Sequence, residues 1–315
     1  MLSSIYDRYT NFIKIYNLIK KIFNNNYSQC LVPLRKKNLY AIDNKIFLKK
    51  RIGQNSVYGT VFISHINKYK FITKVQLDDS ASINELKYLK IIRKYALNTQ
   101  NFHLPLYMIN FKCESYNIFD NRLPPNIVEQ YYYSYNSTIA EIANGDLDEY
   151  IETTIKEEKK DMDEKIINAI KQCIIALMTL HHLGIFHNDT HIGNFLFFKV
   201  KSTKGYYQYN FNDKQFYLKN TGNIFITWDF GLSKDLYSHD NIIKDYYKFL
   251  ESFKKHLKRF CIKNDVVLSD KVTDFINLTI SNFYMYRDNK EIIRTLFSDD
   301  DKKPSGKLLG TVNLF

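Results

Sequence analysis

The chain has 315 residues, of which 45% are hydrophobic, so it holds enough apolar material for packed cores in one large or two modest domains. Its 45 Lys and Arg residues against 33 Asp and Glu residues give a formal charge of +12, which favours nucleotides, acidic protein segments, nucleic acid or anionic membranes as partners. The four cysteines are far apart and form no C-x-x-C pair, which argues against a zinc site and a disulfide framework.

Two further classes of protein are disfavoured. No Arg-rich block or nucleic-acid-binding motif accompanies the positive charge, so we expect no dedicated nucleic-acid site. No apolar run reaches transmembrane length, and residues 1–23 interrupt their apolar positions with Asp7, Arg8 and several lysines, unlike a signal peptide. We therefore expect a soluble, intracellular protein.

The first 75 residues predict one helix followed by strands. Apolar residues recur at helical spacing through residues 4–23, and this stripe could pack on the chain's own core, on a partner or on a membrane surface. We expect the first, because most amphipathic helices pack on their own domain. Short apolar stretches at 45–48, 60–64 and 69–75 predict strands.

A glycine-containing segment, IGQNSVYGTV at 52–61, lies between two of these strands. It is similar to a phosphate-binding G-x-G-x-x-G loop, but only Gly59 and Val61 keep the register of that motif. Gly53 lies one residue too far upstream, and Ser56 replaces the middle glycine. A hairpin turn that binds no ligand is the alternative interpretation.

A lysine and a glutamate follow on two successive predicted elements. Lys74 ends the strand FITK, and Glu85 lies near the start of a helix predicted over residues 82–95. An ion pair between them would hold the lysine over nucleotide phosphates. Ser82 and Glu85 also match a capping box, in which the glutamate only closes the helix N-terminus.

The middle of the chain predicts strands and then a helix start. Residues 103–112 and 126–135 have the composition of strands. In STIAEIANGDLDEYI we expect a strand that ends at Ala143 and a helix that begins around Asp146. As a helix N-cap, Asp146 would need no other role.

A long helix leads from there into a short loop. Residues 151–165 are highly charged and predict a solvated helix and loop, whereas residues 165–184 carry a broad apolar face that predicts a buried helix. The apolar runs at 185–186 and 195–198 predict two small strands that flank the loop.

That loop and a tripeptide downstream carry side chains suited to phosphoryl transfer. His187, Asp189 and Asn194 stand in the order H-x-D-x-x-x-x-N, and Asp229-Phe230-Gly231 follows another predicted strand. Transfer of a γ-phosphoryl group needs metal ligands, a carboxylate near the acceptor hydroxyl and positive charge around the phosphates. These two segments offer the first two requirements, and Lys74 offers the third.

Taken together and in this order, the motifs resemble the protein-kinase superfamily over residues 52–253. The resemblance implies an α+β fold of two lobes, with a small β-rich N-lobe that has one main helix and a larger, mostly helical C-lobe with a short activation segment. The implied domains are an N-terminal extension with an amphipathic helix, the N-lobe, the C-lobe and a flexible tail, at residues 1–50, 51–143, 144–297 and 298–315.

The resemblance also implies a role for each matching residue. Asp189 would orient the acceptor hydroxyl or take its proton, Asn194 and Asp229 would hold Mg²⁺, and Lys74, set by Glu85, would grip the phosphates of ATP. The remaining ATP contacts would come from the glycine segment, from Ile139 at the back of the adenine pocket, from the backbone of Ala140 and Ile142, and from Asp146 near the ribose. His187 and Phe230 would pack in the core.

Several departures indicate an atypical kinase. Asn188 replaces the arginine that many regulated kinases use to bind a phosphorylated activation loop, so we expect constitutive activity. His191 stands where serine/threonine kinases usually have lysine, and the resulting H-x-D-x-H-x-G-N loop resembles that of haspin. The long Tyr-rich insert before Asp229 and the missing A-P-E motif resemble kinases of large DNA viruses. We expect Asp245 to brace the catalytic loop.

The sequence therefore predicts a serine/threonine-protein kinase that uses ATP and Mg²⁺. The basic surface favours acidic protein substrates, and the viral resemblance implies the host cytoplasm or the virion as its location. A kinase for small molecules, of the aminoglycoside or choline type, and a nucleotide-binding pseudokinase scaffold are the alternatives. The sequence leaves open the oligomeric state, the role of residues 1–50, and serine or threonine against tyrosine as the acceptor, the last because His191 removes the usual cue.

Overall fold

The computed structural model describes residues 2–23, 31–34, 39–42, 45–56, 59–113, 134–157, 161–212, 214–283, 285 and 289–314, with only the backbone for 31–34, 39–40, 53–56 and 113. The fold combines helices with mainly antiparallel sheets, in agreement with the predicted α+β class, and the chain divides into two compact units. One, the sheet unit, comprises Arg8–Leu89 and Leu106–Ile142. The other, the helical unit, comprises Met1–Asp7, Lys90–Pro105 and Ala143–Phe315.

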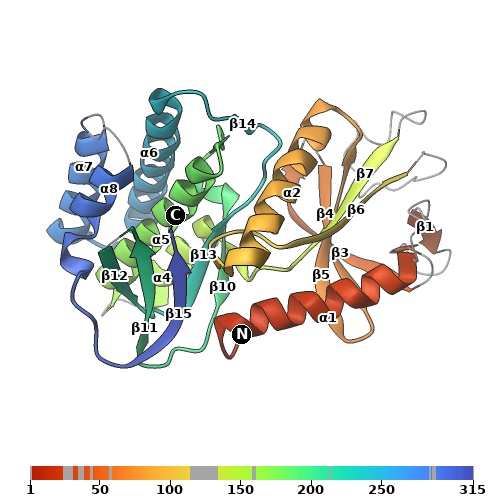
Figure 1. The fold of residues 1–315 in the computed structure, drawn as a ribbon, viewed down its shortest axis with the longest axis horizontal. Helices are drawn as coiled ribbons and strands as arrows, with labels where there is room; N and C mark the ends of the chain where they lie inside the picture. Colours follow the sequence, from red (N-terminus) through yellow and green to blue (C-terminus); the bar gives the residue numbers. More distant parts are fainter. Residues whose placement is uncertain are drawn as a thin grey trace. The chain divides into compact units, whose positions relative to one another are not determined.

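The sheet unit is built on a seven-stranded antiparallel sheet with the order β1-β2-β3-β4-β5-β7-β6 (Figure 1). Burial alternates along β4, as the side chains of a strand point to opposite faces, whereas β7 is buried throughout. The strands are β1 (Leu31–Leu34), β2 (Leu39–Ile42), β3 (Ile46–Ser56), β4 (Gly59–Ile66), β5 (Tyr69–Leu77), β6 (Tyr107–Cys113) and β7 (Tyr135–Ala140). The three strands expected by residue 75 are β3, β4 and β5. Most of the strand expected over 126–135 lies outside the described residues.

Two helices begin in one unit and end in the other, namely α1 (Ile5–Phe23) and α2 (Ser80–Thr99). The apolar face of α1 is buried in this chain, at Phe12, Ile19 and Phe23 among others, which confirms the expectation that it packs on its own core. Not every apolar residue of the helix predicted over 4–23 faces the core, because Ile13 is 50% exposed while Ile15 is buried. In the sheet unit, the Phe23 ring contacts that of Phe111 on β6, at 5.0 Å between centroids.

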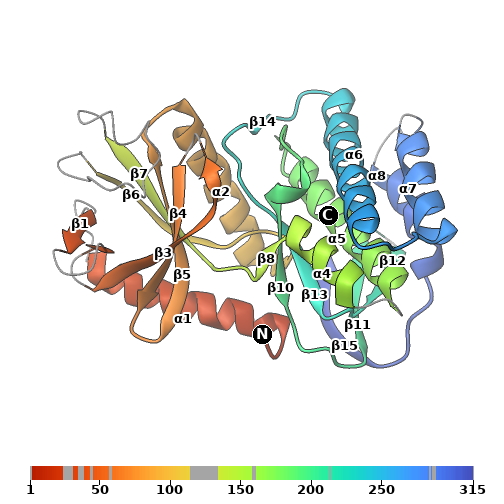
Figure 2. The same ribbon diagram turned by 180° about the vertical axis from the view of Figure 1, so that it is seen from behind.

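The helical unit is organised around α5, which lies among its other helices and strands (Figure 2). The residues of α5 are almost all buried from Ile166 to His181. Its helices are α4 (Leu147–Glu157), α5 (Met162–His182), α6 (His239–Lys263), α7 (Asp270–Phe283) and α8 (Asn289–Leu296), and η1 (Ile192–Asn194) and η2 (Ser298–Asp300) are short 3-10 turns. The charged stretch after residue 151 is less solvated than predicted, because Thr154 and Ile155 are buried on α4.

Short sheets complete the helical unit, in the orders β13-β10-β8, β12-β11-β15 and β14-β9. Their strands are β8 (Gly145–Asp146), β9 (Ile185–Phe186), β10 (Phe195–Lys199), β11 (Gly205–Phe211), β12 (Lys214–Lys219), β13 (Asn223–Thr227), β14 (Lys234–Asp235) and β15 (Lys307–Asn313). The small strands predicted on either side of the loop are β9 and β10, and the Tyr-rich insert forms the β11–β12 hairpin.

The end of the chain differs from the predicted flexible tail. Residues 307–313 form β15, which pairs in parallel with β11. Val312 on this strand and Leu314 just after it are fully buried. Alternating apolar residues at these positions therefore complete a sheet that the middle of the chain begins.

Candidate active site

The loop that carries Asp189 is fixed by its backbone. Gly184, with φ +72°, ends the turn after α5 in a conformation that favours glycine, and β9 then pairs with β14. The next two peptide N–H groups, of His187 and Asn188, donate to the carboxylate of Asp245 on α6, at 2.8 and 2.9 Å. Asp245 is 1% exposed, and its side chain therefore braces the loop as the sequence predicted.

His187 has a packing role in the structure. It is fully buried, its ring lies 5.2 Å from that of Phe230, and its Nε2 donates to the carbonyl of Trp228 at 3.0 Å. Burial lowers the pKa of His187, so the ring is neutral at pH 7 despite the nearby carboxylates. The contact links the loop directly to the Asp229 segment.

The carboxylate of Asp189 is half-buried and contacts side chains through both oxygens. Lys248 on α6 donates to Oδ1 at 2.6 Å, and the amide of Asn194 donates to Oδ2 at 3.0 Å. Nε2 of His191 lies 3.5 Å from the same Oδ2. Burial opposes ionisation here, but the hydrogen bonds of His191 and Lys248 and the positive charge of Lys248 outweigh it and hold the pKa of Asp189 well below its usual range. Asp189 is therefore a carboxylate at neutral pH.

Asn194 and Asp229 are brought together by strand pairing. In the β10–β13 ladder Phe195 lies opposite Thr227, and the N–H of Trp228 donates to the carbonyl of Asn194 at 2.8 Å. Asp229 follows directly, with a left-handed φ of +64° that is uncommon outside glycine. The register thus sets both side chains at the same end of the two strands.

The donor set of these two residues fits a magnesium ion. The Nδ2 of Asn194 donates to the main chain and side chain of Asp189, which leaves its Oδ1 as a neutral oxygen that could bind a metal together with the carboxylate of Asp229. Mg²⁺ prefers oxygen ligands, and it usually takes one or two from the protein and the rest from phosphates and water. Within the described residues no group of three or more His, Cys, Asp or Glu forms a metal cluster, and such a site does not need one.

In the sheet unit, Lys74 and Glu85 form a buried ion pair. Nζ of Lys74 lies 2.9 and 2.8 Å from the two carboxylate oxygens, and the amide of Gln76 donates to one of them at 2.8 Å. The capping-box alternative is wrong, because α2 begins earlier than predicted. Its first turn is closed by Asp79 and Ser82, whose side chains each accept from the other's backbone N–H.

The glycine segment forms the end of β3 and the start of β4, with Ser56 opposite Gly59. Gly53 and Ser56 both lie in β3, and residues 57–58 are outside the described residues. A Cβ on Gly59 would lie 2.7 Å from the carbonyl oxygen of Val75, so close packing against β5 alone requires glycine there. Val61 pairs with Lys74 across the β4–β5 ladder.

The residues predicted to contact adenine and ribose lie at the end of β7 and in the segment after it. Ile139 and Ala140 are fully buried on β7, which ends at Ala140 and not at Ala143, and Ile142 is half-buried beyond it. Asp146 accepts from the backbone N–H of Glu149 at 2.9 Å, which confirms its role as a cap of α4. Burial raises the pKa of Asp146, against the hydrogen bond of that N–H.

Sequence reasoning missed two charged residues. Lys248 lies on α6, about 60 residues after Asp189 in the sequence, and its side chain contacts that carboxylate. Arg8 of α1 donates to Glu141, just before Ile142, and Glu141 also accepts from the backbone N–H of Leu106. One clue was available for Lys248, since it stands three residues after Asp245 and so on the same face of a helix.

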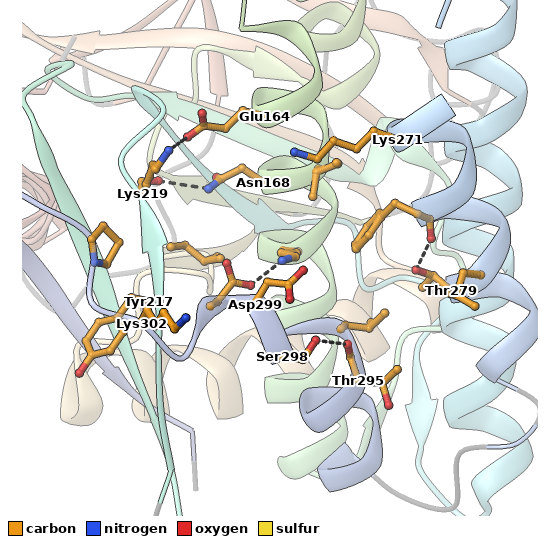
Figure 3. A pocket seen from close by; sticks show the side chains of 18 of the residues that line it. Glu164, Asn168, Tyr217, Lys219, Lys271, Thr279, Thr295, Ser298, Asp299 and Lys302 are labelled. Atoms are coloured by element: carbon orange, nitrogen blue, oxygen red, sulfur yellow. Dashed lines mark hydrogen bonds and ion pairs between the residues drawn. The ribbon is translucent and has the colours of Figure 1, made fainter. Parts of the chain in front are cut away.

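A cavity of about 760 Å³ lies elsewhere in the helical unit, lined by residues of α5, β12 and α7 and by the chain near residues 295–304 (Figure 3). Some of its polar side chains bind one another or the backbone: Lys219 pairs with Glu164 at 3.0 Å, and Ser298 donates to the carbonyl of Thr295. None of the predicted site residues lines it.

Comparisons with known proteins give distant likenesses. No protein-family model and no curated protein matches the sequence. Among solved structures, the chain is similar to WaaP in complex with acyl carrier protein, with 11% identity over 79% of this chain and 83% of that chain and a TM-score of 0.45. It is also similar to the BubR1 kinase domain, with 15% identity over 72% of this chain and 60% of that chain and a TM-score of 0.43. What the site can do chemically follows from its own residues.

Among the described helices, none combines the length and the apolar character that a membrane span requires.

Proposed function

We propose that this protein is a kinase that transfers the γ-phosphoryl group of MgATP to a hydroxyl group. The observation that carries the proposal is the surroundings of Asp189. Its ionised, half-buried carboxylate stands in a loop braced by Asp245, and it is hydrogen-bonded to Asn194, which strand pairing joins to Asp229. An acceptor-orienting carboxylate beside two oxygen ligands is the minimum that phosphoryl transfer requires.

In this proposal Asp189 binds the acceptor hydroxyl. The acceptor oxygen forms a bond to the γ-phosphorus while the bond from phosphorus to the bridging oxygen breaks, ADP keeps that electron pair, and the hydroxyl proton passes to Asp189. A carboxylate with a lowered pKa is a weak base, so its main contribution is to orient the hydroxyl.

Asn194 and Asp229 would hold Mg²⁺, which supplies positive charge to the phosphates when it is bound. Lys74 would bind the phosphates, held in place by the carboxylate of Glu85. The amide of Gln76 donates to the same carboxylate and fixes its position. The remaining nucleotide contacts are proposed for the segment from Gly53 through Ser56 and Gly59 to Val61, for Ile139, Ala140 and Ile142, and for Asp146.

A protein serine or threonine is the acceptor that the sequence motifs favour, and the net charge of +12 favours acidic sites. Constitutive activity is supported by Asn188, whose amide donates to the carbonyl of Leu232 at 3.0 Å. The N–H of Leu236 donates to the carbonyl of Gly184, which also fixes the segment after Gly231. These contacts hold the segment without a phosphate.

The same segment favours a second candidate, a small-molecule acceptor. Residues 231–238 alone join Phe230 to α6, and part of that short connection is used in the β14–β9 pair. Little chain is thus left for binding an extended peptide. A nucleotide-binding scaffold without activity is the third candidate.

Radiolabelled transfer from γ-labelled ATP tests the proposal. The wild-type chain would be incubated with Mg²⁺ or with EDTA, against casein, basic protein, and small alcohols and sugars. We expect Mg²⁺-dependent labelling of one acceptor class, and its loss in Asp229→Asn. Labelling of protein supports the first candidate, and labelling of small alcohols or sugars supports the second. No transfer to any acceptor would overturn the kinase proposal in favour of a scaffold.

A further inference from the structure

The loop around Asp189 has no lysine of its own. His191 stands where the sequence motif of serine/threonine kinases has that lysine, and the structure shows how the histidine is used. Its Nδ1 accepts from the backbone N–H of Gly193 at 3.1 Å and so caps η1. Only Nε2 faces Asp189, at 3.5 Å from Oδ2. The imidazole ring therefore mainly stabilises the conformation of the loop.

A cation reaches Asp189 from α6 instead. Nζ of Lys248 lies 2.6 Å from Oδ1 of Asp189 and 3.3 Å from the carbonyl oxygen of Asn188. Asp245 stands three residues earlier, so the two side chains emerge from neighbouring turns of one helix face. One face of α6 therefore makes both contacts. Asp245 binds the backbone of the loop, and Lys248 binds the carboxylate of Asp189.

The ammonium group has capacity left after these contacts. Lysine carries three N–H donors, and two of them are used by Asp189 and Asn188. The Lys248 side chain is 41% exposed, so its third donor is accessible to a substrate oxygen. A fully buried lysine with every donor engaged would serve structure alone.

We propose that Lys248 is the acceptor-side cation of the phosphoryl-transfer site, supplied by α6 in place of a lysine in the loop. It orients the carboxylate of Asp189 and offers its third N–H to an oxygen of the phosphoryl group in transfer. This inference rests on the proposed kinase function, and it adds a residue that none of the sequence motifs contains. A cation at this point acts on charge that develops in the transition state, so it affects turnover more than nucleotide binding.

Steady-state kinetics of four single variants test the proposal. Lys248→Met keeps the aliphatic part of the side chain and removes the charge, and we expect kcat to fall about 10²-fold with KM for MgATP little changed. Lys248→Arg should recover kcat to within about tenfold of wild type, because the guanidinium also donates to a carboxylate. Lys255→Ala, which removes the same charge from an exposed position of α6, should behave as wild type. His191→Ala should lose less activity than Lys248→Met.

The outcomes separate this proposal from the kinase proposal. If the wild-type protein transfers phosphate to no acceptor, the kinase function fails and the role of Lys248 falls with it. If the wild type is active and Lys248→Met matches it, or Lys255→Ala loses as much, only the role of Lys248 is overturned. A rise in KM for MgATP at unchanged kcat would also overturn it. Thermal unfolding of each variant shows that the compared proteins are folded, and Lys248→Arg gives the comparison independently of Lys248→Met.

Discussion

The two ion pairs of the proposed site have similar lengths and different surroundings. Lys74 and Glu85 approach to 2.8 Å with side chains only 7% and 2% exposed, whereas Lys248 and Asp189 approach to 2.6 Å at 41% and 24%. A buried charge that loses its partner has no water to replace it, while an exposed one is solvated at once. The first pair should therefore matter for stability as well as chemistry, and the second for chemistry almost alone.

Removal of Glu85 should produce the largest loss of stability. Glu85→Ala leaves the ammonium of Lys74 and the amide of Gln76 buried without this acceptor, and we expect the free energy of unfolding to fall by about 3–5 kcal/mol. The double variant Lys74→Met, Glu85→Leu should be clearly more stable than Glu85→Ala, because no charge is left unpaired, and yet be inactive. Urea unfolding of both would contradict the account if the double variant were the less stable one.

Asp245 is the buried acid that holds the loop of the helical unit, and its removal should produce the second-largest loss of stability. Asp245→Ala removes the acceptor of two backbone N–H groups and of Nε2 of His181, at 3.1 Å, so we expect a loss of about 3 kcal/mol. Asp245→Asn keeps one acceptor oxygen and should lose less. Equal unfolding free energies for wild type and Asp245→Ala would show that the loop does not depend on this brace.

Asn188 tests the backbone of the loop with a smaller effect. Its φ is +63°, so Asn188→Gly and Asn188→Ala both lose the amide contact to Leu232 but differ in the cost of a Cβ in this conformation. Ala should be less stable than Gly by about 1 kcal/mol in chemical unfolding. A more stable Ala variant would mean that the left-handed conformation is not retained in solution.

The smallest effect is expected for the exposed pair. Asp189→Asn removes one charge from a half-exposed ion pair, and we expect its free energy of unfolding to stay within about 1 kcal/mol of wild type. The same denaturation experiment, run beside Glu85→Ala, gives the direct contrast. A loss as large as that of Glu85→Ala would remove the distinction between the two pairs.

Local patterns explain what the sequence could predict. Helical periodicity located α1, α2 and α5 to within a few residues, and the order of a strand with Lys74 and a helix with Glu85 anticipated their contact. Asp245 was also expected to brace the loop, since it follows the D-F-G tripeptide after a short interval. The helices needed only spacing along one element, whereas the contacts of Glu85 and Asp245 were expected from the resemblance to the protein-kinase superfamily.

The failures concern contacts that spacing does not determine. The pairing of β15 with β11 joins segments about a hundred residues apart, so the alternation within 307–313 does not reveal which strand it pairs with. The contact of Lys248 with Asp189 requires that α6 pack under the loop. The capping box was a plausible alternative because Ser82 and Glu85 fit its pattern, but Asp79 starts the helix three residues before Ser82. The proposed roles of the glycine and adenine residues stay predictions.

The most direct test of the central claim, that Asp189 serves chemistry and not stability, is the rate of γ-phosphoryl transfer by folded Asp189→Asn under single-turnover conditions with saturating MgATP. The asparagine keeps the size of the side chain but neither orients the hydroxyl as an anion nor takes its proton. We predict a rate about 10²–10⁴-fold below that of wild type, with a free energy of unfolding within about 1 kcal/mol of wild type. A rate equal to that of wild type would contradict the account.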